Sequence, residues 1–303
     1  FSLVATSRLE QFCGDNGFQL ATDFDPFPSI YTDRPELPLE KIFLHEEKYS
    51  GEATSSKIAR LLQACEKQGA DATLLSALDE VAWTFNIRCS DVEFNPVAYA
   101  YAYVSDEGSV LFIDTRKVDK EVAEELSKSN VKIADYNGVE KFLSHLKDKT
   151  VLLDAAKTSD AIGRSIVNSS VVYAQSPVAL LKAVKNDVQI QGTRNAMVRD
   201  GVALVKLFKW IEDNVASGTI NEWKVAEKAV EFRSESPLYR GESFGMIAGY
   251  KEHGAIVHYE PTKDSAADIH PSGLLLIDTG GQYLDGTTDI TRTITLGDTT
   301  ASE

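Results

Sequence analysis

The sequence predicts an α/β fold in the middle of the chain and an α+β fold in its last third, and two patterns support this prediction. From about residue 55 to residue 154, apolar patterns with helical spacing alternate with short strand-like runs, the order expected for a sheet flanked by helices. After residue 176, two helical patterns come first and strand-like runs follow. The last two runs each carry an aspartate, Asp278 and Asp289.

For residues 1–50 the sequence predicts little regular structure beyond one helix, which contains Leu9, Phe12 and Cys13. Proline fixes φ and lacks a backbone N–H, so a proline-rich run is typical of a connection. Four prolines mark such a connection here: Pro26, Pro28, Pro35 and Pro38. We therefore expect residues 1–50 to be the tail of one domain and a linker to the next.

Residues 51–175 show the alternation of a complete α/β domain. A helix is predicted over 55–69, because its apolar residues share one helical face: Ile58, Leu61, Leu62 and Cys65. The later elements are expected in this order: strand 72–76, helix 79–85, strands 98–104 and 109–113, and two helix and strand pairs ending at 151–154. Trp83 is expected to pack in the core of this mixed-sheet domain.

Residues 176–303 open with Ser176-Pro177, which indicates a boundary. A long helix is predicted over 187–215, with apolar residues near a three-to-four spacing that we expect in the core: Val198, Val202, Val205, Phe208 and Ile211. Thr219 and Glu222 have the spacing of a capping box that would open a second helix. Strands near 244–248 and 255–259 are expected next.

Asp278 ends one apolar run and Asp289 begins another, with a glycine-rich reversal between them. If the chain turns back between Gln282 and Gly286, the two aspartates fall opposite each other on antiparallel strands. Opposed side chains on one face have Cβ atoms about 4.5–5.5 Å apart, so two carboxylates there repel unless a proton or a cation lies between them. Carboxylates suit hard or borderline ions, and bridging carboxylates build two-metal hydrolytic sites.

Two other interpretations use the same residues. Asp278 could end a strand before the Gly280-Gly281 turn, and Asp285-Gly286 is a common turn dipeptide. We accept turn formation for Asp285, but favour metal ligation for Asp278 and Asp289. The run Leu-Leu-Ile-Asp278-Thr-Gly is also how an aspartic protease presents its catalytic aspartate. Only one such tripeptide occurs, and the sequence upstream is strongly helical, so this interpretation ranks third.

The residues around the pair resemble a known family. The segments Gly254-Ala-Ile-Val-His258-Tyr-Glu-Pro261 and Tyr283-Leu-Asp-Gly-Thr-Thr-Asp289-Ile-Thr-Arg-Thr are similar to those of Xaa-Pro aminopeptidases, the aminopeptidase P branch of the creatinase and prolidase superfamily. The likeness includes Leu78-Asp-Glu-Val-Ala-Trp83-Thr-Phe-Asn-Ile-Arg88, Asn95-Pro-Val97 and Ser176-Pro177. It implies three segments: the tail of a first creatinase-like domain at 1–50, a second creatinase-like domain at 51–175, and part of a pita-bread metallopeptidase domain at 176–303.

The resemblance also implies the chemistry. Members of this family release the first residue from peptides with proline at position 2, using two divalent metal ions, usually manganese. Asp278 would then chelate one ion and Asp289 would bridge both, while His258 would hydrogen-bond the substrate or transition state. Thr291 lies two residues beyond Asp289, on the same strand face, and is expected to hydrogen-bond a metal ligand.

The family uses five metal ligands, and a histidine and two glutamates follow the aspartate pair at a distance. The four other histidines, His45, His145, His253 and His270, all precede Asp278, and Glu303 lies too close behind Asp289. We therefore expect this chain to be a fragment without either end, to bind metal weakly or not at all, and to be inactive by itself. The alternative is a pita-bread binding module that has lost its ligands.

The composition excludes some classes of binding partner and indicates a cellular compartment. The formal net charge of −15 argues against nucleic acid and anionic membranes, which require a basic face. No apolar run approaches the ~20 residues of a membrane span. Three widely spaced cysteines, Cys13, Cys65 and Cys89, suggest a reducing cytoplasm rather than a disulfide framework. The resemblance implies a homodimer for the complete protein.

Overall fold

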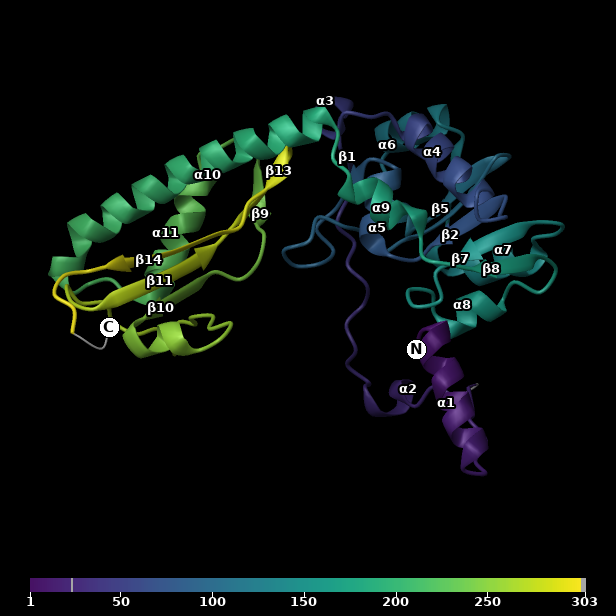
Figure 1. The fold of residues 1–303 in the computed structure, drawn as a ribbon, viewed down its shortest axis with the longest axis horizontal. Coiled ribbons are helices and arrows are strands. Elements are labelled where there is room, and N and C mark those ends of the chain that lie inside the picture. Colours follow the sequence, from purple (N-terminus) through teal and green to yellow (C-terminus); the bar gives the residue numbers. More distant parts are fainter. Residues whose placement is uncertain (23, 301–303) are drawn as a thin grey trace. The chain divides into compact units, whose positions relative to one another are not determined.

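The computed structural model of the chain describes residues 1–22 and 24–300, and it divides into two compact units. The first unit contains Phe1–Glu47 and Glu52–Val184, and the second contains Lys48–Gly51 and Lys185–Glu303. Figure 1 shows a helix-flanked sheet in the first unit and a long helix over antiparallel strands in the second. The three segments predicted from the sequence, with boundaries at 50 and 175, remain a prediction.

The first unit is built on a six-stranded mixed sheet, in the order β6-β5-β4-β2-β7-β8. Strand β4 is antiparallel to β2 and β5, whereas β5–β6, β2–β7 and β7–β8 are parallel. The strands are β2 (Ala72–Leu75), β4 (Tyr101–Ser105), β5 (Gly108–Phe112), β6 (Val131–Ala134), β7 (Thr150–Leu153) and β8 (Ser170–Tyr173). A separate pair joins β1 (Phe43–Leu44) to β3 (Ile87–Arg88). This arrangement confirms the predicted α/β class.

The helices of the first unit are α1 (Leu3–Asp15), α2 (Phe27–Ile30), α4 (Thr54–Glu66), α5 (Leu78–Thr84), α6 (Lys120–Lys128), α7 (Val139–His145), α8 (Asp160–Arg164) and α9 (Pro177–Ala183). Short 3₁₀ turns are η1 (Thr115–Lys117) and η2 (Tyr136–Gly138). Side chains of a strand alternate between faces, so Leu74 packs into one apolar cluster and Leu75 into the other. Trp83 lies in the cluster with Leu75, as predicted for a core residue.

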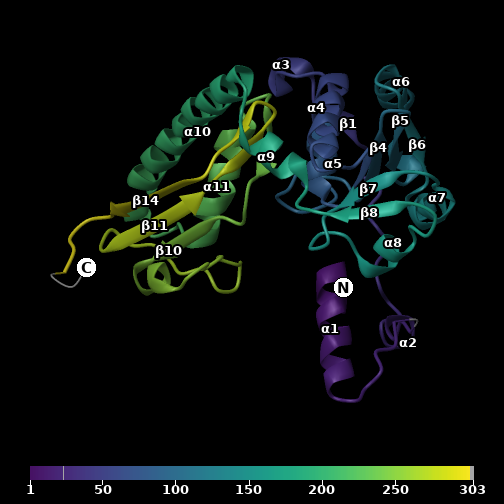
Figure 2. The same cartoon turned by 45° about the vertical axis from the view of Figure 1, so that its right-hand side comes forward.

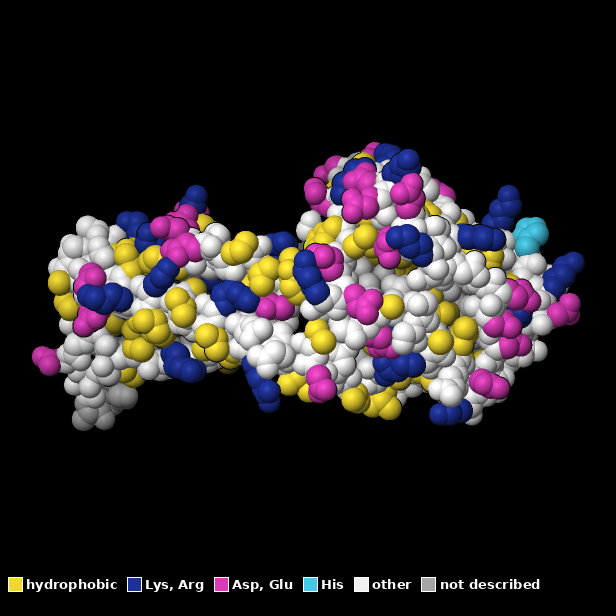
Figure 3. Space-filling view, turned by 90° about the horizontal axis from the view of Figure 1, so that it is seen from above, with side chains coloured by type: hydrophobic (Ala, Val, Ile, Leu, Met, Phe, Trp, Pro, Cys, Tyr) yellow, Lys and Arg dark blue, Asp and Glu magenta, His cyan; other side chains and the backbone are white. Residues whose placement is uncertain are grey.

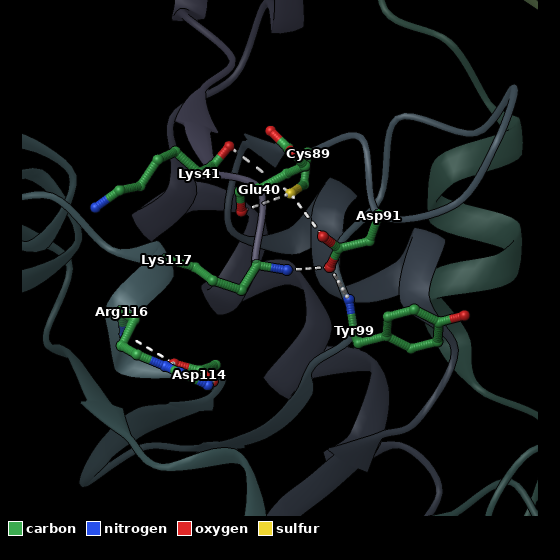
Figure 4. Close-up of polar contacts among 8 residues, drawn as sticks. All are labelled: Glu40, Lys41, Cys89, Asp91, Tyr99, Asp114, Arg116 and Lys117. Atoms are coloured by element: carbon green, nitrogen blue, oxygen red, sulfur yellow. Dashed lines mark hydrogen bonds and ion pairs between the residues drawn. The ribbon is translucent and has the colours of Figure 1, made fainter. Parts of the chain in front are cut away.

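A buried polar cluster around Asp91 links the loop between β3 and β4 to the 3₁₀ turn η1 (Figure 4). The Asp91 carboxylate pairs with Lys117 and accepts hydrogen bonds from the Tyr99 backbone N–H at 2.9 Å and from Cys89 Sγ at 3.3 Å. Removing one partner of a buried ion pair typically costs about 3–5 kcal/mol, so this cluster fixes the loop between β3 and β4. Burial also raises the pKa of the Cys89 thiol, and it raises that of Cys65 to about 11.

The second unit contains two three-stranded antiparallel sheets, in the orders β10-β11-β14 and β13-β12-β9. Their strands are β9 (Tyr239–Glu242), β10 (Ile247–Tyr250), β11 (Leu274–Thr279), β12 (Gly281–Tyr283), β13 (Gly286–Thr287) and β14 (Ile290–Thr295). The helical elements are α10 (Asp187–Asn214), η3 (Val215–Ser217), α11 (Glu222–Ser234) and η4 (Lys251–Ala255), together with α3 (Glu47–Ser50), whose first residue belongs to the first unit. Figure 2 shows α10 and α11 alongside the β10-β11-β14 sheet, and Leu207, Val225 and Ile277 share one core there.

The apolar face predicted for the long helix is partly wrong. Ile211 is buried, but Val198, Val202 and Val205 are 72%, 54% and 68% exposed. Hydrophobic side chains accordingly lie among charged ones on the surface over α10 (Figure 3). The face that packs inward is formed by these buried residues: Gly192, Ala196, Asp200, Ala203, Leu204, Leu207 and Ile211. Small residues and an aspartate occupy this face, and apolar spacing alone does not reveal it.

The start of α11 also differs from the prediction. The helix begins at Glu222, and Asn221 caps it by accepting a hydrogen bond from the Lys224 backbone N–H at 2.9 Å. Thr219 is therefore not the N-cap. The Glu222 carboxylate is fully buried instead of reaching back toward a cap, and it binds the loop described below. Of the described helices, none has the length and apolarity to cross a bilayer.

Candidate metal centre

Asp278 lies near the end of β11, the central strand of its sheet. It is opposite Ile247 on β10 and opposite Thr291 on β14. The neighbouring residues Ile277 and Thr279 are buried against the helices, so Asp278 projects from the other face of the sheet, where it is half-buried. Thr291 Oγ1 donates a hydrogen bond to Asp278 Oδ1 at 2.7 Å. Within the described residues, no side chain or backbone group donates a hydrogen bond to the second carboxylate oxygen.

The predicted opposition of Asp278 and Asp289 is wrong. Thr291 is the cross-strand partner of Asp278, and Asp289 lies just before β14, two residues from that position and exposed. The reason is that the connection is not a simple hairpin: β12 pairs with β9 and with β13 in a second sheet. Asp278 therefore lies before β12 and Asp289 lies after β13 in the chain.

Asp285 lies in the turn between β12 and β13, as predicted. Its carboxylate also receives two hydrogen bonds of 2.9 Å from the Arg199 guanidinium on α10, a bidentate ion pair. The turn packs closely on the helix, because a Cβ at Gly192 would lie only 2.2 Å from the Asp285 carbonyl oxygen. Asp285 therefore anchors the turn.

His258 lies in a loop rather than in the strand predicted over 255–259. Residues 251–255 form the 3₁₀ turn η4, and His258 is exposed with a φ of 55°, in the left-handed region. The loop folds back over β10, where a Cβ at Gly249 would lie 2.8 Å from the Gly254 backbone. Ile256 and Val257 are 52% and 82% exposed, so this apolar run does not belong to the core.

The buried carboxylate of Glu222 holds this loop. Its oxygens accept hydrogen bonds from the backbone N–H of Tyr250 at 2.7 Å and of Ala267 at 2.8 Å, which bracket the loop. Within the loop, the Tyr259 hydroxyl donates at 2.8 Å and His253 Nδ1 lies 3.0 Å from both oxygens. One side chain from α11 thus fixes both ends and the middle of the segment that carries His258.

The donor chemistry of the aspartate pair fits part of a site for hard divalent ions. Both residues offer carboxylate oxygens, and Thr291 orients one of them. Across residues 1–22 and 24–300, however, no three His, Cys, Asp or Glu side chains are grouped so that they could hold a metal ion. His253 is engaged by Glu222. Among the described residues, the aspartate pair therefore has no third His, Cys, Asp or Glu side chain grouped with it.

Three buried charged residues are not among the candidates that the sequence indicates: Asp200, Glu222 and Arg233. The spacing of Glu222 from Thr219 indicates only a cap. Asp200 and Arg233 could have been found from their spacing, because each lies three or four residues from buried residues of its own helix, such as Ala196, Leu204 and Ala229. A charged residue on an apolar helical face requires a buried partner.

Comparisons with known proteins agree with this architecture. Residues 33–189 match the family model of the Creatinase/Prolidase N-terminal domain, and residues 191–303 match that of Metallopeptidase family M24. A protein of Laccaria bicolor named "Probable Xaa-Pro aminopeptidase P" is 40% identical over 279 residues, covering 89% of this chain and 43% of the relative. "Xaa-Pro aminopeptidase 1" of Dictyostelium discoideum is 36% identical over 275 residues, with the same coverages.

Solved structures have the same fold. The X-prolyl aminopeptidase of Caenorhabditis elegans, described as a cytosolic enzyme with a di-nuclear active site, matches with a TM-score of 0.91 and 32% identity over 99% of this chain and 51% of that one. The Xaa-Pro dipeptidase of Bacillus anthracis shares only the fold, with a TM-score of 0.62 and 17% identity over 82% of this chain and 67% of that one. The chain spans about half the length of the curated relatives it matches. It belongs to the creatinase/prolidase family of M24 metallopeptidases.

Proposed function

We propose that the whole protein containing this chain is a metal-dependent aminopeptidase that releases the N-terminal residue from peptides with proline at position 2. This rests on the placement of Asp278, with Thr291 bound to one oxygen, and of Asp289 immediately before β14, within the segment that matches the M24 family. Relatives named Xaa-Pro aminopeptidase support the substrate class.

In this proposal, Asp278 and Asp289 hold two divalent ions, for which manganese is our choice. When bound, the ions supply positive charge that activates water for attack on a peptide carbonyl and stabilises the developing negative charge. Asp278 would hold one ion through the oxygen that Thr291 leaves available, and Asp289 would bridge both. His258, exposed on its anchored loop, would donate a hydrogen bond to the carbonyl oxygen of the scissile bond.

Three further ligands, a histidine and two glutamates, would have to come from outside the described residues, so we propose that the 303-residue chain is inactive by itself. We also propose a cytoplasmic homodimer. The cytoplasmic location is supported by the cytosolic description of the Caenorhabditis elegans structure and by three unpaired cysteine thiols. The alternative is a non-catalytic pita-bread module that binds a partner or peptide. One observation favours it: the described residues contain no cluster of three His, Cys, Asp or Glu side chains that could hold a metal ion.

Metal reconstitution of the whole protein tests the proposal. Chelation with EDTA should abolish hydrolysis of an Arg-Pro-Pro peptide, and added manganese should restore it, because the ions supply the charge that activates water. A matched Arg-Ala-Pro peptide should be cleaved at least tenfold more slowly, about 1.4 kcal/mol of discrimination. Absence of cleavage with manganese present would favour the binding module.

A further inference from the structure

A buried ion pair joins α10 to α11 and contacts residues next to the candidate ligands. Arg233 Nε lies 2.6 Å from Asp200 Oδ1 and Nη2 lies 3.1 Å from Oδ2, and both side chains are 0% exposed. Burial alone would raise the pKa of Asp200, but the hydrogen bonds and charge of Arg233 outweigh it, and the pKa lies below its ordinary value. The pair is therefore ionised inside the core.

The same ion pair reaches the neighbours of both metal-ligand aspartates. Arg233 Nη1 donates to Thr279 Oγ1 at 2.7 Å, and Thr288 Oγ1 donates to Asp200 Oδ2 at 2.8 Å. Thr279 directly follows Asp278, and Thr288 directly precedes Asp289. Two segments nine residues apart in sequence are thus hydrogen-bonded to one rigid unit built from two helices.

The backbone around these threonines leaves little freedom. The Gly281 backbone N–H donates to Thr288 Oγ1 at 2.9 Å, and the Thr288 N–H donates to the Gly281 carbonyl at 3.0 Å. A Cβ at Gly280 would lie 2.0 Å from the Thr288 carbonyl oxygen, so the two segments touch where they leave β11 and enter β14. The Tyr283 hydroxyl, between them in the chain, donates to Asp200 Oδ1 at 2.8 Å.

Buried ion pairs are inefficient as stabilisers, because desolvation offsets their attraction and apolar replacements of equal volume are often as stable. They do fix direction and distance, which metal sites require of the residues that orient their ligands. We propose that Asp200 and Arg233 are positioning residues that set the separation of the Asp278 and Asp289 carboxylates for two metal ions. This inference rests on the proposed function and adds to it a structural determinant of metal affinity.

Paired substitutions of the two threonines in the whole protein separate hydrogen bonding from packing. Thr279→Val and Thr288→Val keep the side-chain volume and remove the hydroxyl, whereas Thr279→Ser and Thr288→Ser keep the hydroxyl and remove a methyl group. Manganese affinity is measured by calorimetry, with no turnover required. Each valine variant should bind manganese about tenfold more weakly, and each serine variant should stay within threefold of the unsubstituted protein.

Thr295→Val is the matched control, because Thr295 is an exposed residue at the far end of β14, opposite Leu274. It should leave manganese affinity unchanged. Valine variants that bind as tightly as the unsubstituted protein would overturn the positioning role, and so would serine variants that bind as weakly as the valine variants. An unsubstituted whole protein that binds no manganese would overturn the proposed function as well. If a valine variant does not fold, the serine variants decide: manganese affinity within threefold of the unsubstituted protein supports the role of the hydroxyl, and a larger loss overturns it.

Discussion

Asp289→Asn in the whole protein should lower kcat/KM for an Arg-Pro-Pro peptide at least about 1,000-fold, equivalent to about 4 kcal/mol of transition-state stabilisation. Asparagine preserves the shape of the side chain but removes the negative charge, and its amide nitrogen cannot ligate a second cation. A residue assigned to bridge two ions should therefore not tolerate this change. The measurement is steady-state hydrolysis at saturating manganese.

Asp298→Asn is the control, because Asp298 is also exposed and follows β14. It carries the same change of charge without a place in the proposed site, so its kcat/KM should match that of the unsubstituted protein. Undiminished turnover by Asp289→Asn would show that Asp289 is not a bridging ligand. Equal losses in both variants would point to a nonspecific effect of charge.

Glu222→Gln should free the loop that carries His258. The carboxylate accepts hydrogen bonds from Tyr250, Tyr259, Ala267 and His253, and glutamine offers a single acceptor oxygen and a donor that faces other donors. Leaving buried donors unsatisfied costs about 1–3 kcal/mol, so amides in residues 251–268 should exchange with solvent about tenfold or more faster. Hydrogen exchange with mass spectrometry on the 303-residue chain measures this directly.

Glu227→Gln provides the comparison, since Glu227 is exposed on the same helix, α11. Exchange in the 251–268 loop should be unchanged in this variant. If Glu222→Gln leaves the loop as protected as before, the loop is held by its other contacts and Glu222 does not anchor it. In the whole protein, the Glu222 variant should also lose peptide hydrolysis, because His258 would no longer be held in place.

The parts of the fold that depend on local pattern could be predicted from the sequence. The alternation over 55–154 and the two apolar runs around the aspartates appear, because a periodic apolar pattern reflects burial there. The helix near 187–215 also appears, although the face that it buries is not the predicted one. The two-residue period of a strand likewise predicts that Thr291 shares a strand face with the residue two positions before it, Asp289. These features need no knowledge of distant contacts.

The features that could not be predicted depend on partners far away in the sequence. Residues 255–259 have a strand-like pattern, yet Glu222 holds them as an exposed loop from the start of α11. The register of Asp278 shifts to Thr291, because β12 pairs with the distant strand β9. On α10, Asp200 lies on the buried face only because Arg233 on α11 neutralises it. Spacing along one helix can place such a residue on a buried face, but it does not identify the partner on another element.

The assignment of Asp278 and Asp289 as two ligands of a dinuclear site is tested most directly by the amount of manganese that the whole protein binds. Calorimetric titration should give two ions per chain for the unsubstituted protein and no tight binding for the double variant Asp278→Asn, Asp289→Asn. The 303-residue chain alone should also show no tight site. Two ions bound with unchanged affinity by the double variant would contradict the assignment.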